Sequence, residues 1–379
     1  LQQLLGIIKF IAILAKNRRD TIMNNKNPKL AISAIIPLLL LIAASLPSVA
    51  AKPDFSGVYD VATLTPFQRP KEFGDNLFLT KKQASAITDE AAAAAKERDR
   101  NLGPTKGAPP VGGAAPIGAD EGARETSGAG NVGGYNNFWV DAGTDVFSVD
   151  GKFRTSIITE PKNGRMPSLT PQAMKIAMER RKFYKPNDGS AWWVNLEGAG
   201  PYDGPESLAT SERCIIGFTG ATPTFPSLYN NFKRIVQTPG HVMILLEMVH
   251  DARIVRMNSE HRPAALQHWL GDSIGWWEGD TLVVDTINFH PLSRQARGGS
   301  TNMHVIEKFS QMNDGNVLYS FTVDDPSVWA QAWSGEYVWR KSDDRVYEYA
   351  CHEGNYSMEG ILKGARILES EAPGVVESD

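Results

Sequence analysis

The polar string with the clearest potential for chemistry is Cys351-His352-Glu353-Gly354-Asn355. A histidine titrates near neutral pH and a carboxylate can act as its partner, so His352 and Glu353 are candidates for proton transfer. Neighbouring side chains on a β-strand point to opposite faces, so these two can share a site only where the strand has ended, which Gly354 permits. The alternative is a structural histidine that is hydrogen-bonded beside a disulfide.

A second polar group closes a strongly apolar stretch, where Glu247 and His250 are followed by Asp251 and Arg253. Buried together, these side chains form an ion-paired cluster with shifted pKa values, which is a physical mark of a functional site. The alternative is a solvated turn at His250-Asp251, with Glu247 paired to Arg253 across it. The candidate acid/base residues are therefore His352, Glu353, Glu247 and His250.

The nine tryptophans of the chain offer walls for an apolar or aromatic ligand, and arginines are available for an acidic group on that ligand. The alternative is that the large aromatic residues simply fill the interior of a barrel. The predicted ligand-binding residues are Arg154, Arg165, Trp192, Trp276, Trp277 and Trp333.

Several motifs of known chemistry are missing from the sequence. It has no G-x-S-x-G elbow, no Walker loop and no G-x-G-x-x-G followed by a helix, so we expect no nucleotide or nicotinamide cofactor. Four histidines, His241, His261, His268 and His304, lack the spacing of metal ligands, and no metal site is expected.

Cys214 and Cys351 are the only two cysteines. An even number in an oxidising compartment favours a disulfide, which contributes roughly 4–5 kcal/mol in the chain-entropy model when it closes so long a loop. Two buried free thiols are the alternative. A metal site is disfavoured because Cys351 and His352 are adjacent and no C-x-x-C pair exists.

The segment from Met23 to Ala51 has the pattern of a secretory signal peptide, with lysines before an apolar run and small residues at its end. The alternative is a membrane anchor, but Pro37 and Pro47 interrupt the run. Residues 1–22 are interpreted as upstream translated sequence. We therefore expect an exported protein, periplasmic or extracellular, with no stable membrane span after cleavage.

Without residues 1–51, six basic residues and one acidic residue are lost from the 39 and 43 of the whole chain, which leaves a net charge of −9. This charge argues against a nucleic-acid or anionic-membrane partner, since both need a basic face. The predicted division is upstream sequence and signal peptide in 1–51, a helix-and-loop cover in 52–230, and a β meander in 231–379, with the last two parts forming one joint domain.

Alternating apolar residues and tight turns predict a succession of strands after residue 231. The central hairpin spans Trp269 to Phe289 and turns at Glu278-Gly279-Asp280. The nine expected strands are 233–237, 241–248, 253–257, 272–277, 281–289, 303–311, 317–324, 336–341 and 346–351.

The cover is predicted to contain a short strand near Phe55, a helix over 79–100, a mobile loop over 101–134, and a helix over 172–184 capped by Thr170-Pro171. An open sheet of nine strands leaves bare edges, so we expect closure. The predicted fold is all-β with minor α, a lipocalin-like antiparallel β-barrel covered by the N-terminal segment.

Four strings resemble a family of uncharacterised secreted bacterial proteins, and together the matching parts extend over most of the mature chain. The resemblance implies an exported, β-rich protein and carries over no catalytic residue. The matching strings are YNNFWVD (135–141), GPYDGPESLATSERC (200–214), GDSIGWWEGDTLVVDT (271–286) and YACHEGNYSMEGILKGAR (349–366).

Two functions follow as hypotheses. In the first, the barrel binds a small hydrophobic or aromatic molecule, and its catalytic version adds cofactor-free isomerase, hydratase or lyase chemistry. In the second, the protein is a non-catalytic interaction module for a protein or glycan partner. An enclosed pocket of a few hundred Å³ favours the first, and tryptophans on a flat exposed face favour the second.

Overall fold

The structure is a computed structural model that describes residues 51–100, 141–183, 185, 189–217, 222–353 and 355–372. The chain divides into two compact units, Leu1–Lys52 and Pro53–Asp379. The expected signal peptide and the expected loop over 101–134 lie outside the described residues.

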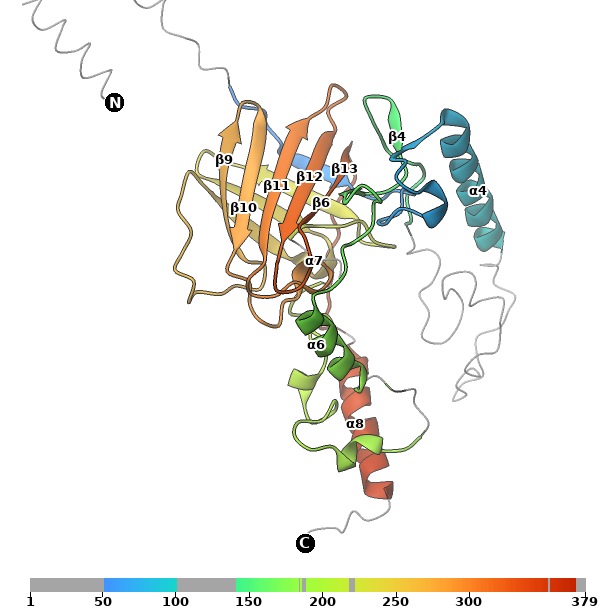
Figure 1. The fold of residues 1–379 in the computed structure, drawn as a ribbon, viewed down its shortest axis with the longest axis vertical. Coiled ribbons are helices and arrows are strands. Elements are labelled where there is room, and N and C mark those ends of the chain that lie inside the picture. The colour runs from blue at the N-terminus through green and yellow to red at the C-terminus, as the bar shows by residue number, and fades with distance from the viewer. Residues whose placement is uncertain are drawn as a thin grey trace, which may run out of the picture. The chain divides into compact units, whose positions relative to one another are not determined.

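Nine strands form a closed barrel, because the first strand hydrogen-bonds both to β6 and to β13. The sequence predicts the closed barrel, but the ninth strand is β1 rather than the expected strand over 346–351. Their order around the ring is β1, β6, β7, β8, β9, β10, β11, β12 and β13 (Figure 1). The bounds are β1 Gly57–Asp60, β6 Phe232–Gln237, β7 His241–Leu246, β8 Ala252–Met257, β9 Asp272–Glu278, β10 Thr281–Ile287, β11 His304–Gln311, β12 Val317–Asp324 and β13 Trp333–Ser342.

One neighbouring pair in the ring is parallel, namely β8 and β9, and the other neighbours are antiparallel. An odd number of strands cannot alternate in direction all the way round a ring, so at least one parallel pair is unavoidable. The strictly antiparallel pattern expected from the sequence is therefore broken at this pair.

Residues 258–271, here named the strap, run back along the barrel so that β9 can start at the same end as β8. The strap is fastened to the start of β9 and the end of β10. His261 Nδ1 lies 3.0 Å from Asp272 Oδ2, the Arg262 N–H donates to the same oxygen at 2.8 Å, and Asn288 Nδ2 donates to the Arg262 carbonyl at 2.9 Å.

The two ends of the barrel differ in the length of their connections. At one end, short turns over 238–240, 279–280 and 312–316 join consecutive strands. At the other end, here named the loop end, lie the long connection over 288–303 with the short turn α7 (Gln295–Gly298), the connection over 325–332, and the return over 247–251. Side chains from distant parts of the sequence therefore meet at the loop end.

The barrel interior is filled by side chains that alternate along each strand, as expected for a strand with one buried face. Aromatic residues dominate the packing, and Tyr319 lies within 5.0 to 5.9 Å, ring centre to ring centre, of Phe309, Phe321, Tyr337 and Trp339. Trp277 faces inward and stacks on Phe55 at 5.9 Å.

A charged pair lies inside the barrel, where the Arg253 guanidinium on β8 contacts the Glu307 carboxylate on β11 and both side chains are almost fully buried. Arg253 donates to Glu307 Oε1 at 2.8 Å, and the Tyr319 hydroxyl donates to the same oxygen at 2.6 Å. Burial, together with the negative charge of Glu307, holds the pKa of Tyr319 well above its usual value, so this hydroxyl stays a donor.

The segment before the barrel supplies further strands and helices. β5 pairs with the first half of β13, and β2, β3 and β4 form a separate small sheet. The Thr170 side chain accepts from the Ala173 N–H at the start of α6, which confirms the predicted cap. The bounds are β2 Phe78–Leu79, α4 Lys81–Arg100, β3 Ser148–Val149, β4 Lys152–Arg154, β5 Ile158–Glu160, α6 Pro171–Arg181 and the 3-10 turns η1 Lys71–Phe73, η3 Trp192–Asn195, η4 Pro205–Ser207 and η5 Met248–His250.

The C-terminal region departs from the sequence-based expectation. Residues 346–351 form no strand, because β5 and β1 already occupy the free edge of β13. Helix α8 (Tyr356–Glu371), which the sequence analysis missed, follows instead and packs through Ala365 and Leu368 against Trp193. Trp193 Nε1 also donates to Glu369 Oε1 at 2.6 Å.

The buried pair gives a stability prediction. Glu307→Gln leaves the Arg253 guanidinium buried without a counter-charge, and we expect a loss of about 3–5 kcal/mol in the free energy of unfolding, measured by urea denaturation. Adding Arg253→Met removes the buried cation and should recover at least half of that loss. The control is Glu278→Gln on the exposed Glu278–Lys308 pair, which should behave as wild type. Equal urea midpoints for Glu307→Gln and wild type contradict this account.

Candidate functional site

The four predicted acid/base residues do not meet in one place. His352 and Glu353 lie exposed on a turn after Cys351. His250 is also exposed, and its Nδ1 is 3.3 Å from the Tyr349 carbonyl oxygen. Glu247 alone is buried, and its carboxylate accepts from the backbone N–H groups of Phe232 and Tyr347, both at 3.4 Å.

Glu247 belongs to a buried charge cluster at the loop end whose centre is Lys233, a residue that sequence reasoning missed. The Lys233 ammonium is fully buried, and the charges of Glu247, Asp251 and Asp60 act on it. Burial lowers the pKa of Lys233 to about 8, although these three carboxylates oppose the change. The predicted alternative of a Glu247–Arg253 pair is wrong, because Arg253 pairs with Glu307 inside the barrel.

The six predicted ligand-binding residues are also dispersed. Arg154 pairs with Glu336 at 2.7 Å, and Arg165 donates to the Arg69 carbonyl at 2.9 Å. Trp333 is buried among aromatic residues of the barrel, whereas Trp192 packs on Trp193 beside α8. The hairpin tryptophans divide between faces, since Trp277 packs on the core and Trp276 Nε1 donates to Glu278 at 3.2 Å.

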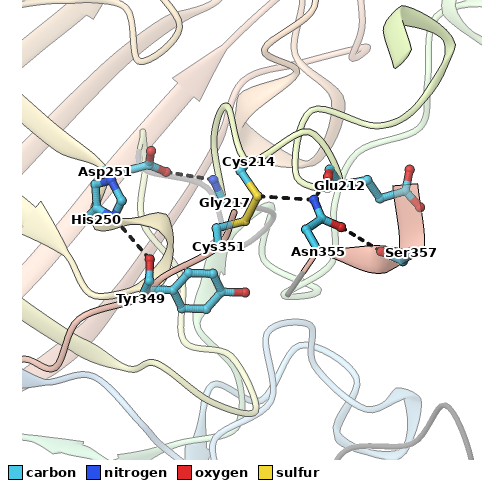
Figure 2. The surroundings of a disulfide bond; sticks show 9 residues. All are labelled: Glu212, Cys214, Gly217, His250, Asp251, Tyr349, Cys351, Asn355 and Ser357. Carbon is cyan, nitrogen blue, oxygen red and sulfur yellow. Dashed lines mark hydrogen bonds between the residues drawn. A yellow bond between two sulfur atoms is a disulfide. The ribbon is translucent and has the colours of Figure 1, made fainter. Parts of the chain in front are cut away.

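The predicted disulfide between Cys214 and Cys351 is present, with Cα atoms 5.7 Å apart. Three residues after Cys214, the Gly217 N–H donates to Asp251 Oδ2 at 2.8 Å, and Figure 2 shows both linkages. The segment 214–217 is thus fastened to the C-terminal region by a covalent bond and to the barrel by a hydrogen bond. It forms a partition between two clefts at the loop end, and Ile216 lines both of them.

The larger cleft, here named the arginine cleft, has a volume of about 740 Å³. Its walls come from residues 63–67, 142, 210–211, 216–217 and 225–228, and from the turn 293–297. Arg294 and Arg297 line it, and no Asp, Glu, His, Lys, Cys or Tyr occurs among its described lining residues. The cleft therefore carries unbalanced positive charge.

Arg297 lies over an aromatic platform in this cleft. Its guanidinium carbon is 4.1 Å from the Phe67 ring centre and 5.7 Å from that of Phe225. Burial lowers the pKa of Arg297, and no carboxylate of the described chain offsets this. The Ser293 hydroxyl, also in the lining, is buried without a hydrogen-bond partner among the described residues.

The turn that presents these arginines is held in an unusual backbone conformation. Arg294, Ala296 and Arg297 have φ values of 47°, 52° and 65°, in the left-handed region that costs roughly 1–3 kcal/mol per non-glycine residue. Gln295 anchors the turn, since its Oε1 accepts from Thr222 N at 3.2 Å and its carbonyl from Gly299 N at 2.8 Å. Such strain concentrates at ligand sites.

The second cleft, here named the aspartate cleft, has a volume of about 620 Å³ and opens where the parallel strands β8 and β9 begin. The strap forms one wall through Arg262 and residues 268–271. Apolar lining comes from Ile215, Ile216, Val249, Ile254, Trp269 and Leu270. Asp251 also lines this cleft, and burial raises the pKa of its carboxyl group to about 6.

Alternating carboxylate and histidine side chains form a further chain of contacts, separate from the buried Lys233 cluster and from the arginines of the arginine cleft. Asp272 contacts His261, whose Nε2 is 3.4 Å from Asp285 Oδ1, and His304 Nε2 is 2.8 Å from the same oxygen. The hydrogen bond to Asp285 raises the pKa of His304. Within the described ranges, no group of three or more His, Cys, Asp or Glu residues is arranged to hold a metal ion.

No protein-family model matches the chain, and no curated protein matches it either. The resemblance stated from the four sequence strings therefore stays a prediction. None of the helices in the described segments combines the length and apolar character needed to cross a membrane.

The raised pKa of Asp251 gives a pH-dependent prediction. The carboxyl pKa is about 6 in the folded state against an ordinary value of 3.8, so its ionisation disfavours folding, and the penalty grows as the pH rises from about 4 to about 6. Asp251→Asn keeps an acceptor for the Gly217 N–H. At pH 7 this variant should be more stable than wild type by on the order of 2–3 kcal/mol.

Urea unfolding at several pH values checks this expectation. The free energies of unfolding of the two proteins should differ little at pH 4, and the variant should be clearly more stable by pH 7. The matched control is Asp343→Asn, at an exposed turn position, which should follow the wild-type profile. A variant that is less stable than wild type at pH 7 would show that the ionised carboxylate is favourable there.

Proposed function

We propose that the protein binds a small anionic molecule with an aromatic or otherwise apolar body, and that the arginine cleft is its site. The observation that supports this most directly is the Arg297 guanidinium, which lies over Phe67 at the cleft wall with no carboxylate partner in the described chain. A guanidinium offers several donors in one plane, which suits a carboxylate, sulfonate or phosphate group on a ligand.

The shape of the cleft agrees with this ligand class. Its volume of about 740 Å³ falls in the range of small-molecule sites, roughly 300–1,000 Å³. Phe67, Phe225 and Leu228 provide apolar contact. The strained turn holds Arg294 and Arg297 before the ligand arrives, which reduces the entropy lost on binding.

The residues that line the cleft support ligand binding without catalysis. None of the described lining residues of the arginine cleft titrates near neutral pH, so proton transfer has no carrier there. The alternative of a flat interaction module is less well supported, because Trp329, Trp333 and Trp339 are buried in the barrel rather than displayed on its surface. The disulfide is consistent with an oxidising compartment and supports an exported protein.

A pair of fluorescent dyes tests this proposal. 8-Anilinonaphthalene-1-sulfonate carries an anionic group, and N-phenyl-1-naphthylamine is its uncharged analogue. A hydrogen bond to a charged group contributes about 1.5–3 kcal/mol, so Arg297→Gln should weaken sulfonate binding about tenfold or more. Binding of the uncharged dye should change little, and equilibrium titration measures both.

The matched control is Arg181→Gln, an exposed arginine in α6, which should leave both dissociation constants at the wild-type values. If Arg297→Gln binds the sulfonate as tightly as wild type does, the arginine cleft is not the anion site. Native mass spectrometry of the protein from its own host should also find a co-purifying anion that Arg297→Gln loses.

A further inference from the structure

The charges that line the aspartate cleft are paired, with one exception. Arg253 contacts Glu307, Arg256 contacts Asp272 at 2.9 Å, and Arg262 Nε is 4.0 Å from the same carboxylate. Three positive groups in the wall are thus offset by two carboxylates. The Asp251 carboxylate has no such ion pair, and the one hydrogen bond it makes within the described chain is accepted from the Gly217 N–H.

The Asp251 carboxylate has one oxygen available to the cleft. Oδ2 accepts from Gly217, whereas Oδ1 has no hydrogen-bond partner among the described residues, and Asp251 is part of the cleft lining. The residue as a whole is only 9% exposed. The residue is nine-tenths buried, and only one of the two carboxylate oxygens accepts a hydrogen bond from the described chain. A ligand that donates to Oδ1 therefore gains a strong interaction.

The charge cluster behind Asp251 holds more carboxylates than cations. The Lys233 ammonium faces Glu247, Asp60 and Asp251 itself, and Arg340 also acts on Asp60, which gives three carboxylates for two cations. The Lys233 ammonium donates to the Asn230 carbonyl at 3.2 Å, and within the described residues it makes no hydrogen bond to Asp251. A positive group arriving in the cleft therefore meets an attractive potential.

We infer that the aspartate cleft binds an organic cation, with the Asp251 carboxylate as counter-ion for an ammonium group and the apolar wall as the contact for its body. This site is separate from the arginine cleft and does not depend on the function proposed there. Ile215, Ile254, Trp269 and Leu270 supply apolar contact, and Ile254 is 49% exposed.

An organic cation fits better than a metal ion. Metal ions require several oxygen, nitrogen or sulfur donors at one point, and no such group of three occurs within the described part of the chain. An ammonium group needs one good acceptor and tolerates apolar surroundings for the rest of the molecule. The cleft volume of about 620 Å³ accommodates a molecule the size of an arylalkyl amine.

Protonation of Asp251 must compete with such a ligand. The carboxyl pKa near 6 means that the ligand displaces a proton in mildly acidic solution and none above neutrality. The other titratable or charged groups around the carboxyl are His250 on its own turn, Lys233 on β6, and His241, His268 and Arg253 in the cleft wall. Histidine protonation also repels a cation, so the contribution of Asp251 has to be isolated by substitution.

The experiment uses benzylammonium as the probe and benzyl alcohol as its uncharged analogue, with isothermal titration calorimetry from pH 5 to pH 7.5. Benzylammonium should bind wild-type protein more tightly as the pH rises, by about tenfold per unit below pH 6. At pH 5, titration in buffers of different ionisation enthalpy should report release of close to one proton per ligand. Benzyl alcohol should show neither effect.

Asp251→Asn should weaken benzylammonium binding at pH 7.5 at least tenfold and abolish the proton release at pH 5. Asp343→Asn is the control and should behave as wild type. Proton release is measured on the wild-type protein, so the test holds even where the variant folds poorly. Benzylammonium binding without proton release, binding unchanged in Asp251→Asn, or no binding at millimolar probe overturns the inference.

Discussion

Closure of a ring of nine strands is the constraint on which the other features depend. β1 joins β6 to β13, and the odd strand number forces the parallel pair β8 and β9. A parallel pair cannot be joined by a tight turn, so the chain returns through the strap. The strap then forms one wall of the aspartate cleft, at the point where both parallel strands begin. Strand parity thus requires a parallel pair, and the location of that pair between β8 and β9 sets the position of this cleft.

The balance of charge distinguishes the interior of the barrel from its loop end. Inside, the Arg253 guanidinium is paired with the Glu307 carboxylate, which also accepts from the Tyr319 hydroxyl, as expected for buried charges. At the loop end, two charged groups lack a full counter-charge, and one of them is positive and the other negative. Arg297 has no carboxylate, and Asp251 shares a single ammonium with two other carboxylates. The partition 214–217 keeps these two unbalanced groups in separate clefts, and the disulfide fixes the partition.

Much of the barrel could be predicted from sequence because its strands alternate strictly, as Val317–Asp324 does, and because short turns set their register. The prediction of a strand over 346–351 was wrong, because the local alternation of apolar residues does not reveal that β1 and β5 already occupy the edge of β13. Helix α8 was missed although Ile361, Leu362, Ala365 and Leu368 recur at helical spacing, a signal that two glycines weaken.

The candidate sites were less predictable, because their residues meet only through the tertiary fold. Asp251 belongs to the polar group at 247–253 that the sequence indicates. Its hydrogen bond to Gly217 and its proximity to the Lys233 charge, however, arise only from the tertiary fold. Nothing near Arg297 in sequence indicates that Phe67 and Phe225 form a platform beneath it. Arg154 and Arg165 had the right chemistry, but their charges and donors are used by Glu336 and by the Arg69 carbonyl.

The pairing of β1 with β13 also determines when the barrel can form during synthesis. Tyr59 on β1 lies opposite Lys341 on β13, so the ring can close only after β13, the last of its strands, has been synthesised. Contacts this distant in sequence make folding slow, because loop entropy is lost before the contacts form. Until β13 leaves the ribosome, the edges of β1 and β12 stay exposed. Ring closure therefore cannot precede the synthesis of β13.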